Sequence, residues 1–133
     1  MPYTLIDHTA DIGIRVSAPS TEGLFEEAAY AIADIMGGRS DEGLQEVMVE
    51  SQGIDQVDLL VRWLQEILYL IEVKGFRLRA ATIQRLTETL ALGVIQGEYT
   101  AEPLTTEIKA VTYHNLDITC IDNVFAVTII LDR

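Results

Sequence analysis

The segment from Asp55 to Gly75 constrains the fold more than any other part of this 133-residue chain. Asp55 is a typical N-cap residue, and Gly75 suits the left-handed position that often follows a helix. Between them the polar side chains recur at steps of three and four residues, so they form one narrow stripe on the predicted helix. The stripe consists of Asp58, Arg62, Gln65, Tyr69 and Glu72. Nearly all of the remaining helix surface is apolar, which indicates either deep packing across a sheet or a surface offered to a partner.

A shorter helix is predicted from Ser20 to Met36, because Ser20 offers an N-cap, apolar residues recur at helical spacing, and Gly37 follows. The other apolar runs predict strands at 5–6, 12–16, 44–50, 76–83, 89–95, 107–121 and 124–131. This order favours an α+β fold, a two-layer sandwich of a mostly antiparallel sheet with two main helices on one face. Residues 1–133 are expected to form a single domain.

The C-terminal strands are expected to form a hairpin around residues 122–123, an Asp-Asn pair suited to a two-residue turn. With that turn, Cys120 lies opposite Phe125 on the predicted core side of the ribbon. If the pairing continues without interruption, Tyr113 lies opposite Asp132. A bulge between the strands would shift this register.

The net charge of the chain narrows the range of functions that we expect. The chain carries 21 acidic and 9 basic residues, a formal net charge of −12, and the first 60 residues alone account for −10. Nucleic-acid binding usually begins with basic side chains on phosphates, so we expect no direct high-affinity nucleic-acid binding. Metal ions and basic protein partners are favoured instead.

The sequence also indicates the cellular compartment in which we expect the protein. The single Cys120 has no partner for an internal disulfide, which fits a reducing compartment. No signal peptide and no apolar stretch of membrane-spanning length is present, so we expect a cytoplasmic protein without a membrane association.

Carboxylates near the two ends of the chain form one candidate site. His8 and Asp11 lie in a short polar loop, and Asp132 ends the last predicted strand. If the N-terminal strands lie beside the last one, Asp11, Asp132 and the terminal carboxylate of Arg133 would form an oxygen-rich pocket suited to a hard cation. The alternative is that the loop residues cap backbone groups and Asp132 is a solvated strand end.

The segment from 107 to 114 is a second candidate, because Lys109, Tyr113 and His114 are crowded on one predicted strand. The alternative for His114 is a hydrogen-bonded structural residue. Nucleophilic or phosphate-binding motifs are absent from the sequence: no GxSxG elbow, P-loop or GxGxxG occurs. An enzymatic function therefore has little support.

Several blocks together resemble the archease family over essentially the whole chain. They are His8-Thr9-Ala10-Asp11-Ile12-Gly13, Leu59–Tyr69, Gly97-Glu98, Ile108–His114 and Asp132. The resemblance implies an α+β sandwich and a non-enzymatic protein cofactor. Such a cofactor activates an RtcB-type RNA ligase in tRNA splicing and RNA repair, by promoting GTP-dependent guanylylation of the ligase histidine and multiple turnover.

The resemblance also implies a site. Asp11 and Asp132 would bind a divalent cation, calcium before magnesium or manganese, with Arg133 contributing through its main chain or terminal carboxylate. Family members usually end in an aliphatic residue, so we expect Arg133 to weaken cation binding. The positions with a looser functional assignment are His8, Glu98, Lys109, Tyr113 and His114.

Two other functions stay open. One is a general chaperone or assembly modulator that uses the apolar surface of the long helix. The other is a metal-dependent hydrolase of small phosphorylated substrates, whose site would contain His8, Asp11, His114 and Asp132.

Overall fold

The computed structural model describes residues 2–6, 11–113 and 116–133. The helices are α1 (Thr21–Met36) and α2 (Gln56–Glu72). The strands are β1 (Tyr3–Ile6), β2 (Asp11–Ala18), β3 (Gln45–Gln52), β4 (Phe76–Leu86), β5 (Leu90–Tyr99), β6 (Ala110–Val111), β7 (Ile118–Ile121) and β8 (Val124–Asp132). Among the described residues, no helix is both long and apolar enough to cross a membrane.

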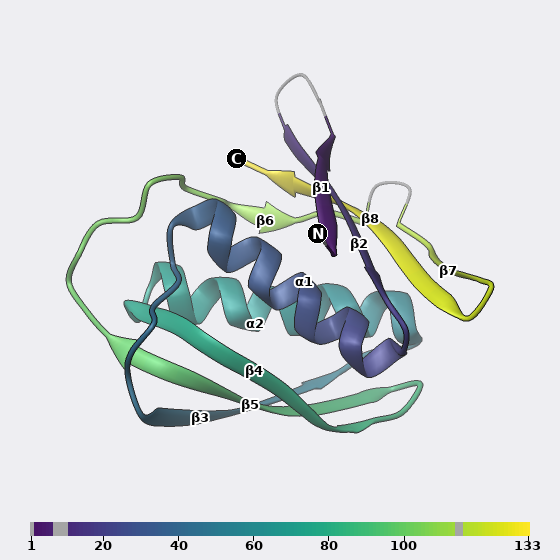
Figure 1. The fold of residues 1–133 in the computed structure, drawn as a ribbon, viewed down its shortest axis with the longest axis horizontal. Helices are drawn as coiled ribbons and strands as arrows, with labels where there is room; N and C mark the ends of the chain where they lie inside the picture. Colours follow the sequence, from purple (N-terminus) through teal and green to yellow (C-terminus); the bar gives the residue numbers. More distant parts are fainter. Residues whose placement is uncertain (1, 7–10, 114–115) are drawn as a thin grey trace.

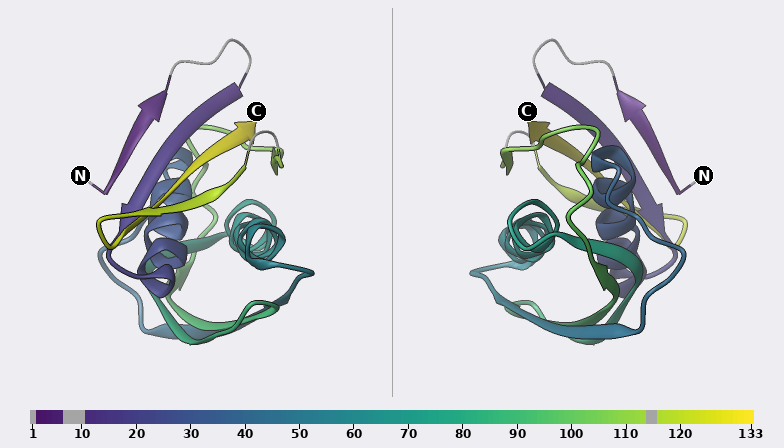
Figure 2. Two further views of the ribbon diagram at one scale, coloured as in Figure 1. Left: turned by 90° about the vertical axis from the view of Figure 1, so that its right-hand side faces the viewer. Right: turned by 90° about the vertical axis from the view of Figure 1, so that its left-hand side faces the viewer.

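The strands form two sheets with the two helices between them (Figures 1 and 2). One sheet has the order β1-β2-β8-β6, with β7 also paired to β8, and the other has the order β3-β5-β4. Every described strand pair is antiparallel. The α+β class with two main helices is therefore confirmed.

The predicted single sheet is replaced by two sheets on opposite sides of the helix pair. Helix α1 contacts β2 and β4, and helix α2 contacts β3 and β6, so each helix touches both sheets. Both helices bury apolar side chains around much of their circumference. A helix of that kind needs cover on more than one side, which one sheet does not supply.

The helix ends follow the local signals in the sequence. The Ser20 hydroxyl accepts a hydrogen bond from the Gly23 N–H at 3.0 Å, and Gly37 adopts a left-handed φ of 73° after α1. The Asp55 carboxylate accepts from the Asp58 N–H at 2.8 Å at the start of α2. These caps satisfy backbone groups that a helix end leaves unpaired, and both predicted helices are confirmed.

The C-terminal strands agree with the prediction only near the turn. Cys120 lies opposite Phe125 as expected, but Val111 lies opposite Leu131, which leaves three extra residues between the two pairings. The predicted continuous strand 107–121 is thus two short strands, β6 and β7, on one edge of β8. Asp132 pairs with Ala110, so the expected pairing with Tyr113 is wrong.

Cys120 is exposed, whereas the sequence placed it on the core side. Strand β7 pairs with β8 at the end of the sheet that projects past the helices (Figure 1). The β8 residues that pack into the core cluster are Val127, Ile129 and Leu131, each at most 1% exposed, and they lie further along β8 than the partners of Cys120 and Ile121.

Helix α2 packs closely against the second sheet at Trp63. This side chain is fully buried, and its indole N–H donates to the Phe25 carbonyl at 3.0 Å. A Cβ added to Gly93 of β5 would lie 2.6 Å from Cη2 of Trp63, well inside van der Waals contact. Gly93 therefore permits the close approach of helix and strand.

We expect Gly93→Ala to lower the free energy of unfolding by about 1–3 kcal/mol, because the new methyl group overpacks the Trp63 ring. In a Trp63→Phe background the cost should fall by at least about 0.5 kcal/mol, since the overlapping ring atoms are gone. Denaturant unfolding of the four proteins measures both effects. Strictly additive costs would show that the two residues do not compete for space.

Candidate functional site

The pairing of β2 with β8 brings together the two predicted metal ligands. Asp11 lies directly opposite Asp132, and the next pair is Ile12 opposite Leu131. Cross-strand partners share one face of a sheet, so both carboxylates lie on the face opposite the fully buried Leu131. Asp132 is exposed and Asp11 is half-buried.

Lys109 joins this pair through its backbone. Its N–H donates to the Asp132 carbonyl at 2.7 Å, just before β6 begins. Lys109 is one of the residues that line a cavity of about 420 Å³, together with Tyr69 and Glu72 of α2. Arg133 follows β8 and is exposed. Three predicted residues, Asp11, Asp132 and Lys109, are therefore gathered at one end of the first sheet.

The donor set at Asp11 and Asp132 fits a hard divalent cation. Carboxylates directly opposite each other on a sheet repel, and a cation between them would offset that repulsion. Calcium binds six to eight oxygen ligands, so two carboxylates would make up only part of its coordination. In residues 2–6, 11–113 and 116–133 no group of three or more His, Cys, Asp or Glu side chains is arranged to hold a metal.

Among the remaining predicted site residues that the structure describes, Glu98 is not gathered with Asp11 and Asp132. Glu98 lies on β5 of the other sheet, opposite Arg77. His8 and His114 lie outside the described residues.

Tyr113 is half-exposed and reaches α2 rather than β8. Its hydroxyl donates to the Asp58 carboxylate at 2.6 Å. The same carboxylate accepts from the Ile54 N–H at 2.9 Å and from Nε of Arg62 at 3.0 Å. With Asp58 only 8% exposed, this buried charge has three hydrogen-bond partners, as a buried carboxylate requires.

These contacts shift both pKa values. The Tyr113 hydrogen bond, followed by the Ile54 N–H, holds the pKa of Asp58 below its ordinary value. The same bond, with partial burial, raises the pKa of Tyr113. The pair is therefore held as carboxylate and neutral phenol across the middle of the pH range.

The polar stripe of α2 faces the segment that contains Lys109. Asp58 binds Tyr113 at one end of the stripe, and the Gln65 amide donates to the Val111 carbonyl at 3.2 Å further along. The stripe therefore holds residues 109–113 against β8. Sequence reasoning found the stripe but missed the role of Asp58. A signal was present, because Arg62 follows Asp58 by four residues in the first turns of the helix.

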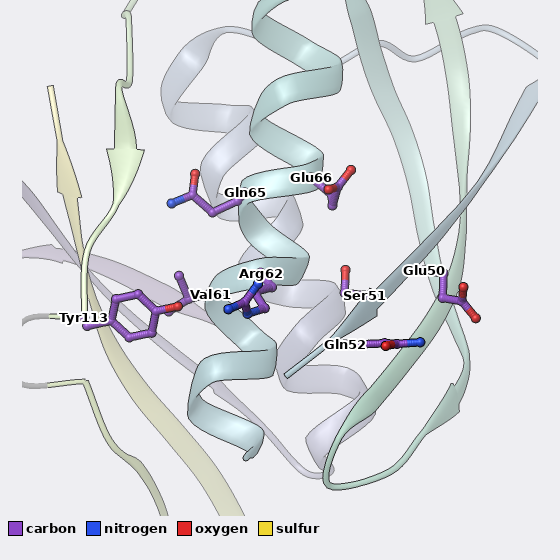
Figure 3. Close-up of a pocket in the computed structure, with 8 residues that line it drawn as sticks. All are labelled: Glu50, Ser51, Gln52, Val61, Arg62, Gln65, Glu66 and Tyr113. Carbon is purple, nitrogen blue, oxygen red and sulfur yellow. The ribbon is translucent and has the colours of Figure 1, made fainter. Parts of the chain in front are cut away.

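A polar pocket of about 500 Å³ lies against α2 (Figure 3). Its lining comes from β3, α2 and the segment after β6. The lining residues are Glu50, Ser51, Gln52, Val61, Arg62, Gln65, Glu66 and Tyr113. Apart from Tyr113, none was a predicted site residue.

Known proteins resemble this chain over nearly its full length. Residues 3–132 match the archease protein family (MTH1598/TM1083). The archease of Methanopyrus kandleri is 38% identical, with 89% of each chain covered, and that of Archaeoglobus fulgidus is 34% identical, with 99% of each covered.

Two solved structures have the same fold. The solution structure of Methanobacterium thermoautotrophicum protein 1598 has a TM-score of 0.74 at 28% identity and covers 99% of each chain. An archease of Thermotoga maritima, described as a possible chaperone, has a TM-score of 0.71 at 26% identity and covers 96% of this chain and 94% of its own. The chain thus has the α+β fold of these two solved proteins. It belongs to the archease family.

Tyr113→Phe should lower the thermal unfolding midpoint at pH 7, because it removes one partner of the buried Asp58 carboxylate. The pKa of Asp58 is lowered in the folded state, so its contribution is present above about pH 4, the unfolded value, and is lost as pH falls through the folded value. The pKa of Tyr113 is raised, so the contribution of its neutral hydroxyl is present below about pH 10 and is lost at higher pH.

The difference in midpoint between Tyr113→Phe and wild type should therefore be largest near neutral pH and shrink at both extremes. Tyr69→Phe, an exposed tyrosine on the same helix, is the matched control and should have little effect. A difference that stays constant from pH 3 to pH 7 would contradict the role given to Asp58.

Proposed function

We propose that this chain is a protein activator of an RtcB-type RNA ligase in tRNA splicing and RNA repair. It would promote GTP-dependent guanylylation of the ligase histidine and multiple turnover, without itself catalysing ligation. Membership of the archease family supports this proposal. The observation that carries it is the register that sets Asp11 opposite Asp132, beside the backbone of Lys109.

In this proposal the carboxylates of Asp11 and Asp132 hold a divalent cation, calcium before magnesium or manganese. Arg133 would add its main-chain oxygen or a terminal carboxylate. The cation supplies a fixed positive charge that can accept further oxygen ligands from a partner. Lys109 holds the Asp132 backbone, and the α2 stripe in turn holds the Lys109 segment.

Asp132→Asn should reduce the acceleration of ligase guanylylation by at least about tenfold, equivalent to about 1.4 kcal/mol of activation free energy. The change keeps the side-chain shape and removes the charge that attracts the cation. The measurement is the rate of GTP-dependent guanylylation of the ligase from the same organism, with and without this protein.

Asp117→Asn is the matched control, because Asp117 is also exposed but lies between β6 and β7, outside both β8 pairings. It should leave the acceleration unchanged. If wild type gives no acceleration at any manganese concentration, the activator function is wrong.

Cation binding can also be measured as an increase in the stability of the folded protein. Calcium at about 100 times its dissociation constant should stabilise the wild-type protein by about 2.7 kcal/mol, because it binds the folded state alone. The stabilisation should be lost in Asp132→Asn. Thermal unfolding with calcium or with a chelator measures it, and an equal shift in wild type and variant would place the cation elsewhere.

A chaperone function is the second candidate, favoured by the description of the Thermotoga maritima structure as a possible chaperone. It requires that the protein suppress aggregation of unrelated clients. That suppression should survive Asp11→Ala, whereas ligase activation should not.

A further inference from the structure

The polar pocket between α2 and β3 has a lining rich in hydrogen-bond acceptors. Ser51 is only 6% exposed, and its hydroxyl has no hydrogen-bond partner in the described part of the chain. In Figure 3 this hydroxyl lies between the side chains of α2 and those of β3. A buried hydroxyl without a partner costs free energy, so its retention at a pocket indicates that something else binds it.

One carboxylate of the pocket is also available. The Glu66 side chain is exposed and forms no ion pair with any other described residue, whereas Glu50 alternates with the buried Ser51 along β3 and points away from α2 (Figure 3). The one cation in the lining, Arg62, already donates from Nε to the Asp58 carboxylate at 3.0 Å. The pocket with Asp58 included therefore carries an excess of negative charge.

The amide of Gln65 does not join these groups, because its Nε2 donates to the Val111 carbonyl and the side chain points away from Ser51 (Figure 3). Taken together, the hydroxyl of Ser51 and the carboxylate of Glu66 call for a ligand that carries several N–H donors and a positive charge. Guanidinium has five N–H donors in a planar fork and no acceptor.

We propose that this pocket receives the guanidinium of an arginine side chain on an extended segment of a basic protein partner. The net charge of −12 on the whole chain favours association with a basic partner. The pocket holds neither Asp11 nor Asp132. The inference therefore stands apart from the cation site and does not depend on ligase activation.

The test uses the full chain and the capped peptide acetyl-Val-Arg-Val-amide, followed by NMR. The backbone amides of residues 50–52, 62–66 and Tyr113 should shift on titration. The same peptide with citrulline, a neutral isostere, or with lysine should bind at least about fivefold more weakly, because charge-assisted bidentate hydrogen bonds are lost.

Two variants separate recognition from structure. Glu66→Gln should weaken binding of the arginine peptide, and Glu88→Gln, an exposed carboxylate in the turn between β4 and β5, should not. Ser51→Ala should weaken binding without lowering the thermal midpoint, because it removes a hydroxyl that has no partner in the protein. A purely structural Ser51 would lower the midpoint instead.

Three results would overturn the proposal. Citrulline or lysine peptide could bind as tightly as the arginine peptide. The shifts could centre on another surface, such as the ends of β2 and β8. Glu88→Gln could weaken binding as much as Glu66→Gln does, which would indicate diffuse attraction to the net charge.

Discussion

The antiparallel pairing of β2 with β8 is the constraint on which both the core and the candidate site depend. In this register Ile14 and Val16 of β2 face the helices together with Ile129 and Val127 of β8, and all four are buried. The same alternation sets Asp11 and Asp132 on the opposite face. A slip of one residue in either strand would turn its carboxylate toward the apolar core, which is costly for an unpaired charge. Packing of the apolar core therefore fixes the register that places the two carboxylates opposite each other.

Helix α2 supplies the second half of the arrangement. Its apolar surface fills the space between the sheets, and its single polar stripe binds the segment 109–113 through Tyr113 and Val111. That segment forms β6 on the free edge of β8 and places the Lys109 N–H on the Asp132 carbonyl. The polar stripe predicted from the sequence thus binds another part of the same chain, and two of its members, Arg62 and Gln65, also line the α2–β3 pocket.

Features that depend on neighbouring residues could be predicted from the sequence, and features set by distant contacts could not. The helix caps at Ser20 and Asp55 and the pairing of Cys120 with Phe125 are local and were predicted correctly. The pairing failed beyond β7 because three more residues lie between the β7 and β6 pairings than a continuous register allows, and Tyr113 bonds to Asp58 of α2 instead of pairing with Asp132. The prediction that Cys120 faces the core also failed, because its burial depends on where the helices end beneath the sheet.

The candidate site divides in the same way. Asp11 and Asp132 were predicted as a pair from their sequence positions and from the family resemblance, and the structure places them opposite each other. Ser51 and Glu66 belong to different elements that meet only in the folded chain, so no spacing in the sequence joins them.

The most direct test of the cation site is paramagnetic broadening of the backbone amides by a small fraction of manganese. If the cation binds between the two carboxylates, broadening centres on Asp11, Lys109 and Asp132 and falls off toward the second sheet. Broadening centred instead on Glu50 and Glu66 in the α2–β3 pocket, with the amide of Asp132 unaffected, would contradict this position of the cation.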